Sequence, residues 1–146
     1  MTTKGQLVVV GVDGSAESVA ALKWADAYAA ATGARIRVVM AWHYPAAVGP
    51  APVGVAPAAI TEEVRQHVTE ALDKTVAEAA VGVDVEKQVG YGHPAQVLVD
   101  QSAGADLLVV GHRGHGAFTG MLVGSVSVHC VTHAHCPVVV VRSDAR

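Results

Sequence analysis

The sequence predicts an α/β fold, an open five-stranded parallel sheet with helices on both faces. Five short apolar segments alternate with stretches of helical periodicity, in the order β-α-β-α-β-α-β-α-β. Three of these segments are almost wholly apolar and β-branched, which is typical of strands covered on both faces. Strict alternation of strands and helices favours parallel pairing through helical crossovers.

The expected strands cover residues 6–12, 35–42, 84–90, 106–111 and 137–142. Strand 84–90, DVEKQVG, alternates polar and apolar residues instead of being apolar throughout. A strand at the edge of a sheet has this pattern more often than a central one, so we expect 84–90 at an edge.

Four helices are expected between these strands. The first covers 15–32, with Ser15 as N-cap and Gly33 at its end. The second covers 58–80, carries apolar residues at every fourth position and is expected to end at Gly82. The third begins at Pro94 and closes near Gly104, and the last begins at Ser125 and must end before Pro137.

Length and composition restrict the class of protein. A chain of 146 residues with 51% hydrophobic residues is expected to form one domain, residues 1–146, with a full core. A net charge of -3 without a basic face argues against a nucleic-acid partner. No apolar run is long enough for a membrane span, and the first residues do not resemble a signal peptide. With two cysteines, these features favour the cytoplasm.

Residues 43–57 interrupt the pattern, because they hold four of the six prolines and form an unusually long connection. Two interpretations stay open, a disordered crossover and a lid over a ligand.

The glycine-rich stretch VVGHRGHGAFTGMLVGSVS, residues 109–127, directly follows the fourth strand. Glycine lets a ligand approach the backbone closely, and exposed N–H groups bind anions. A helix that begins at Ser125 adds unpaired N–H groups and a favourable dipole. We therefore interpret the stretch as a phosphate cradle. It lacks the lysine of a Walker A loop, and its spacing does not fit the dinucleotide fingerprint.

The spacing present is Gly111-x2-Gly114-x9-Gly124-Ser125. With VGVDGS near the start and GSVSVHCVTHAHCPVVVVR near the end, it resembles the ATP-binding branch of the universal stress protein family. The resemblance covers the whole chain. It implies strand order 3-2-1-4-5, in which the first and fourth strands are neighbours at the point where ligands bind.

The resemblance also implies an ATP site. Gly11, Val12 and Asp13 would contact adenine or ribose, and Ala41 would line the adenine pocket. The ribose and phosphates would be wrapped by Gly111, His112, Arg113, Gly114, His115, Gly116 and Ala117. Phosphate oxygens would be bound by Gly124, Ser125, Val126 and Ser127, and Mg²⁺ could accompany ATP near Asp13.

Each of these residues also has a structural interpretation. Asp13 fits the ordinary Asp-Gly-Ser turn before a helix. Gly111 and Gly114 fit plain turns, and Ser125 can serve as an N-cap while it binds phosphate. His112, Arg113 and His115 can be solvated loop residues.

The segment HCVTHAHC contains possible zinc ligands, namely His129, Cys130, His133, His135 and Cys136. Cys130 is offset around the helix from His129, and Cys136 directly precedes Pro137, where the chain enters a strand. We therefore expect a small, buried cysteine at Cys136 and no metal held by the protein alone.

These observations predict an ATP-binding module for stress response or signalling. Between Gly111 and Arg142 there is no lysine or carboxylate, so at most weak hydrolysis is expected. The alternatives are a dimeric interaction module without nucleotide, a slow ATPase and a binder of another adenine nucleotide such as a cyclic one. A homodimer through Val138 to Val141 is expected, because this apolar strand would otherwise be an open edge. The resemblance also implies such a dimer.

Overall fold

A computed structural model describes residues 5–42, 57–112 and 125–142 of the chain. Five parallel strands form one sheet in the order β3-β2-β1-β4-β5. This confirms the predicted fold class and the neighbouring positions of β1 and β4. The strands are β1 (Leu7–Val12), β2 (Arg35–Trp42), β3 (Val85–Tyr91), β4 (Leu107–Gly111) and β5 (Val138–Val141).

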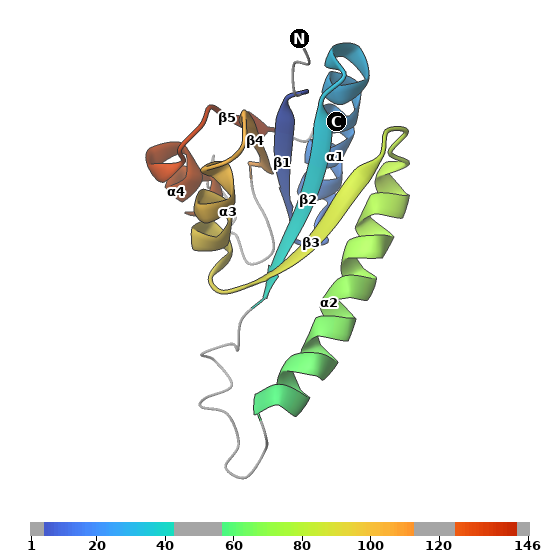
Figure 1. Ribbon diagram of the computed structural model, residues 1–146, viewed down its shortest axis with the longest axis vertical. Coiled ribbons are helices and arrows are strands. Elements are labelled where there is room, and N and C mark those ends of the chain that lie inside the picture. The colour runs from blue at the N-terminus through green and yellow to red at the C-terminus, as the bar shows by residue number, and fades with distance from the viewer. Residues whose placement is uncertain (1–4, 43–56, 113–124, 143–146) are drawn as a thin grey trace.

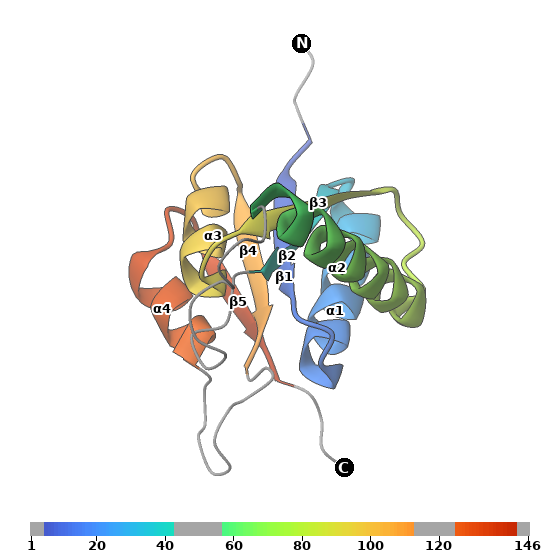
Figure 2. The same ribbon diagram turned by 90° about the horizontal axis from the view of Figure 1, so that it is seen from below.

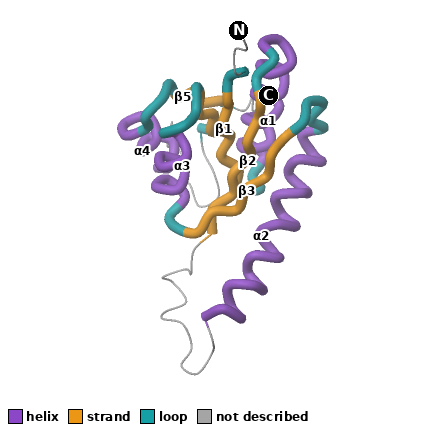
Figure 3. Tube along the Cα trace, viewed as in Figure 1, coloured by secondary structure: helices purple, strands orange, loops and turns teal. Residues whose placement is uncertain are grey.

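The helices cover both faces of this sheet (Figure 1). They are α1 (Ala16–Thr32), α2 (Pro57–Ala79), α3 (Pro94–Ser102) and α4 (Ser125–His133). Seen from below, α1 and α2 lie on one side of the sheet and α3 and α4 on the other (Figure 2). The tube in Figure 3 shows how each short loop returns the chain from a helix to the next strand.

Alternation along the strands divides the core into two clusters. Val8, Val10 and Val12 of β1 face α1 and α2, where Leu22 and Leu72 are almost fully buried. The residues between them face α3 and α4, together with Leu98 and Cys130. This division follows from the two-residue period of a strand.

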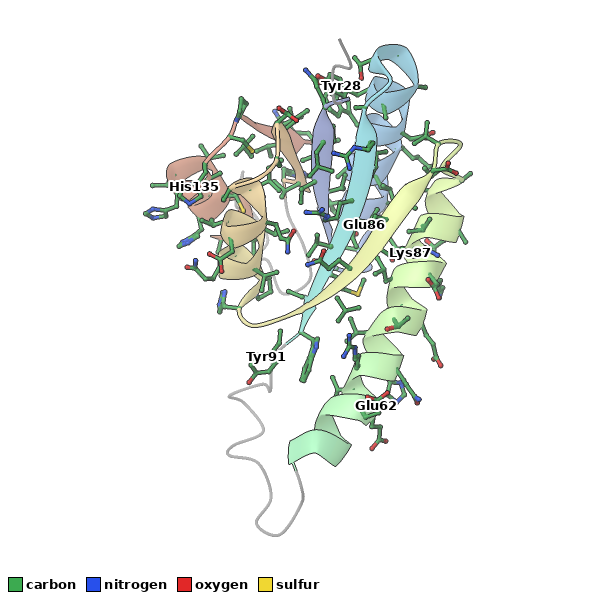
Figure 4. The ribbon with its side chains drawn as sticks, in the orientation of Figure 1. Tyr28, Glu62, Glu86, Lys87, Tyr91 and His135 are labelled. Carbon is green, nitrogen blue, oxygen red and sulfur yellow. The ribbon has the colours of Figure 1, made fainter. Side chains whose placement is uncertain are left out.

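The central strands are fully covered, whereas the edges are not. All six residues of β1 are buried, but every residue of β5 is only half-buried. β3 occupies the other edge, as its alternating sequence predicts. Its exposed charges are used locally, since Lys87 Nζ lies 2.9 Å from Asp73 Oδ1 of α2. Figure 4 shows Lys87 and Glu86 on this strand.

The ends of α1 are the expected ones, but the end of α2 is not. Ser15 Oγ accepts a hydrogen bond from the N–H of Ser18, and Gly33 adopts a φ of 77°. The left-handed residue after α2 is Ala80, with a φ of 52°, and not Gly82. Asp26 of α1 explains the turn, because its Oδ1 accepts hydrogen bonds from the N–H groups of Gly82 and Val83.

Candidate nucleotide site

The carboxyl ends of the parallel strands meet at one edge of the sheet, the lower edge in Figure 1. At this edge β1 and β4 are hydrogen-bonded neighbours, with Val10 paired to Val109. Strand order reverses between them, which is where open α/β sheets bind ligands. Asp13 follows β1 and His112 follows β4, so the two predicted loops begin side by side.

Asp13 takes part in the turn that leads into α1. Its Oδ1 accepts a hydrogen bond of 2.9 Å from the N–H of Ser15, and Gly14 between them has a φ of 85°. Asp13 itself is exposed at the carboxyl edge. The turn interpretation of Asp13 is therefore correct.

Gly11 and Val12 are buried, and Val12 packs in the cluster beneath α1. A Cβ atom at Gly11 would lie 2.5 Å from Leu98 Cδ1 of α3. A ligand can therefore reach these two residues only through their backbone.

Gly111 is needed for close packing at the end of β4. A Cβ atom there would lie 2.8 Å from the carbonyl oxygen of Glu17 in the first turn of α1. Because backbone atoms cannot swing aside as a side chain can, any larger residue would push α1 away from the sheet.

The end of β4 is also tied to α4 and to β5. Ser127 is 2% exposed, and its Oγ donates a hydrogen bond to the carbonyl oxygen of Gly111. The N–H of His112 donates to the carbonyl oxygen of Val141 at 2.9 Å. The His112 side chain is 8% exposed, and its Nδ1 has no hydrogen-bond partner among the described residues.

A pocket of about 310 Å³ opens between the first turns of α3 and α4. Its size is at the lower end of the range of about 300–1,000 Å³ that is usual for small-molecule sites. Six described residues line it: His93, Ala95, Gln96, Ser125, Val126 and His129. The first turns of two helices present unpaired N–H groups to this space, which favours an anion.

An aromatic pair stands at the ends of β2 and β3. Trp42 and Tyr91 are partners in the register, and their rings meet edge to face with centroids 4.7 Å apart. Tyr91 is 69% exposed, and Figure 4 shows it at the lower edge of the sheet. Ala41, the predicted adenine contact, precedes Trp42 and packs on the side of α3 and α4.

Comparison with known proteins shows the family to which the chain belongs. The model of the universal stress protein family matches residues 6–142. The chain belongs to the universal stress protein family. It is 37% identical over 150 residues to a universal stress protein of Mycolicibacterium smegmatis, covering 94% of this chain and 48% of that protein. The chain thus spans about half the length of the curated relatives it matches.

Solved structures of universal stress proteins share the fold. UspA from Lactobacillus plantarum superposes with a TM-score of 0.74 at 24% identity, over 97% of this chain and 100% of that one. A universal stress protein in complex with cAMP superposes with a TM-score of 0.72 at 29% identity, over 95% of this chain and 98% of that one.

In this universal stress protein the structure brings part of the predicted site together. Asp13 and His112 begin adjacent loops, and Ser125 and Val126 line the pocket. Ser127, in the first turn of α4, is instead buried, and its hydroxyl donates a hydrogen bond to the carbonyl oxygen of Gly111. Arg113, Gly114, His115, Gly116, Ala117, Gly124 and the 43–56 part of the proline-rich segment lie outside the described residues.

The structure adds four pocket residues that the sequence interpretation did not place in the nucleotide site, namely His93, Ala95, Gln96 and His129. His93 could have been found, because it follows β3 at the same edge as Asp13 and Gly111. His129 was considered only as a zinc ligand.

The suggested zinc ligands are divided between different environments. Cys130 is fully buried in the core cluster beneath α4, and burial raises the pKa of its thiol to about 11. Burial, and then the negative charge of Asp106, raise the pKa of the Cys136 thiol. Both effects oppose the thiolate that zinc requires. In the described part of the chain, no three His, Cys, Asp or Glu side chains are arranged to hold a metal ion.

Proposed function

We propose that this universal stress protein binds ATP at the carboxyl edge of its sheet and acts in stress response or signalling. The observation that carries the proposal is the position of α4, which begins at the strand-order reversal with Ser125 exposed. The pocket beside Ser125 has the size and the helix ends that suit phosphate groups.

The proposed contacts follow the strand ends. Asp13 would bind the ribose or adenine through its carboxylate, and Gly11 and Val12 through their backbone. Ala41 would line the adenine pocket, and Mg²⁺ would accompany ATP near Asp13. Residues 111–117 and 124–127 would hold the ribose and the phosphates.

A second candidate ligand is a cyclic adenine nucleotide. It is favoured by the related universal stress protein whose structure contains cAMP. The two ligands differ in the number of phosphate groups, so the α3–α4 pocket would be occupied by ATP but not filled by cAMP.

The test begins with the freshly purified protein, denatured and analysed by mass spectrometry for retained nucleotide. We expect ATP or ADP, with an affinity for ATP that falls in the variant Gly114→Ala. Retention of cAMP alone would favour the second candidate. Absence of adenine nucleotide together with no binding of ATP, AMP or cAMP in calorimetry would favour an interaction module.

Turnover is expected to be slow, because the described stretches between Gly111 and Arg142 contain no lysine or carboxylate. Phosphoryl-transfer enzymes depend on such groups to position the nucleophile and neutralise charge. Hydrolysis with Mg²⁺ should therefore stay far below the usual enzyme range of about 1–1,000 per second. A rate of about ten per second would make the protein an ATPase.

We also propose a homodimer that pairs β5 with its copy about a two-fold axis. β5 is an edge strand of four valines, all half-buried. On the adjoining α4, Val128 and Val131 are 50% and 59% exposed. An open apolar edge strand and exposed valines are surfaces that proteins normally cover. No helix among the described residues is long and apolar enough to cross a membrane. The cytoplasm remains the proposed location.

A further inference from the structure

Two histidines face the pocket between α3 and α4, and neither belongs to the glycine pattern of the sequence. His93 directly precedes α3, whose first residue is Pro94, and His129 lies one turn into α4. Ser125 lines the same pocket, so the pocket adjoins the proposed phosphate cradle. Its described lining contains no acidic residue.

The charges around the pocket favour an anion. The nearest carboxylate on α3 is Asp100, and it accepts a hydrogen bond from Gln96 Nε2 at 2.8 Å. The ring of His133 lies against that of His129, with centroids 4.5 Å apart. An anion in the pocket would therefore have imidazole rings nearby and no carboxylate in the described lining.

His112 gives a second and independent indication of a ligand on this side of the sheet. Val110 packs beneath α3 and α4, whereas a Cβ at Gly111 would point at α1. The N–H of His112 continues the ladder to β5, so the alternation returns its side chain to the side of α3 and α4. Its buried Nδ1 lacks a hydrogen-bond partner among the described residues, and buried polar atoms normally have one.

We propose that this pocket is the terminal-phosphate subsite of the nucleotide site, in which His93 and His129 bind the phosphates as imidazolium ions and make ATP affinity rise as pH falls. The inference rests on the proposed function. It adds which nucleotides the site prefers and how pH changes their binding. Histidine is the side chain that changes charge between about pH 5 and 8, and a charged hydrogen bond to phosphate is stronger than a neutral one. The titratable groups next to the lining residues include His133, whose ring packs against that of His129, and Asp100, which accepts the hydrogen bond from Gln96.

The consequence is discrimination by phosphate number. ATP and ADP would reach His93 and His129, whereas AMP and cAMP would end at the cradle around Ser125. A fall in pH would then favour the polyphosphates selectively. The site would respond to acidification without a separate sensor domain.

The test measures the binding of ATP and AMP to the full chain at pH 6 and pH 8. The variants are His93→Gln, His129→Gln and their combination, because glutamine is polar, neutral and similar in size. His67→Gln on α2 is the matched control, since α2 covers the opposite face of the sheet. Thermal melts establish that each variant is folded.

We expect the double variant to lose about five- to fiftyfold of ATP affinity at pH 6 and less at pH 8. AMP affinity should be unchanged, and His67→Gln should behave as wild type. Because the terminal phosphate of ATP itself takes up a proton near pH 6, the pH effect is taken as the difference between wild type and double variant. Equal ATP affinities at pH 6 would overturn the subsite and leave the ATP proposal intact.

Tripolyphosphate separates the failure of the subsite from the failure of the nucleotide proposal. If wild type binds no adenine nucleotide, but binds tripolyphosphate at pH 6 more tightly than the double variant does, the proposed function is wrong and the phosphate subsite stands. If it binds neither, both are wrong.

Discussion

Ser127 Oγ lies 2.5 Å from the carbonyl oxygen of Gly111, so the first turn of α4 is fastened to the end of β4. These two residues bracket the glycine-rich stretch. Their hydrogen bond fixes where the chain leaves the sheet and where it enters α4. The predicted cradle therefore has fixed ends, and the hydroxyl of Ser127 has a structural role.

Replacing Ser127 with alanine is expected to lower the free energy of unfolding by about 1–3 kcal/mol, because the hydrogen bond from the buried Ser127 hydroxyl to the carbonyl of Gly111 is lost. Urea unfolding measures this. Ser125→Ala is the matched control, since Ser125 is exposed on the same turn. It should weaken ATP binding and leave stability nearly unchanged. If Ser127→Ala unfolds in urea like wild type, the hydrogen bond to Gly111 does not stabilise the fold.

Asp13 combines a turn contact with a proposed ligand contact, and two substitutions separate them. Asp13→Asn keeps an oxygen that can accept from the N–H of Ser15, so its melting temperature should stay near that of wild type. It should still lose about 1–3 kcal/mol of ATP binding, as expected for a charged hydrogen bond. Asp13→Ala should lose both stability and affinity. Calorimetry measures the loss of ATP affinity, and thermal melts measure the loss of stability. Unchanged ATP affinity in both variants would show that Asp13 has only its role in the turn.

The order of the helices and strands could be predicted because the sequence signals for them are local. Ser15 and Gly33 marked the ends of α1, and the alternating residues of β3 marked an edge. The end of α2 could not be predicted, because Ala80 takes its left-handed conformation where Asp26, far away in sequence, binds the following turn.

The site was predictable to a smaller extent. Asp13, Gly111 and Ser125 follow strands or begin a helix, and the strand order places them at one edge. The role of Gly111 depends on its contact with Glu17 in another element, and the sequence carries no sign of that contact. The presence of both His93 and His129 in the pocket lining likewise depends on how α3 packs beside α4.

Cys130 is expected to resist thiol reagents in the folded protein. It is fully buried, and its thiol has a pKa raised to about 11 from 9.0, so little thiolate exists at pH 8. In the variant Cys136→Ser, labelling at pH 8 should proceed only as fast as the protein unfolds. Rapid labelling without unfolding would show that Cys130 is accessible.

The same pKa shift sets a dependence of stability on pH. The folded state holds the Cys130 proton more tightly than the unfolded state does, so this contribution is complete below pH 9 and is lost between about pH 9 and 11. Cys130→Ala should reduce the decline in stability over that range relative to wild type.

The proposed dimer can be tested with two neighbouring prolines on β5. The carbonyls of Pro137 and Val141 accept hydrogen bonds from β4, at 2.9 Å each. Backbone groups of a strand alternate in direction, so Val139 also faces β4 whereas the N–H of Val140 points away from the sheet. Val140→Pro should therefore remove a hydrogen bond between protomers and leave the β4–β5 ladder intact. Val139→Pro should break that ladder and destabilise the fold. We expect a dimer for wild type in analytical ultracentrifugation, a folded monomer for Val140→Pro and a lower melting temperature for Val139→Pro. A wild-type monomer at micromolar concentration, or a Val140→Pro dimer as tight as wild type, would contradict pairing through this edge.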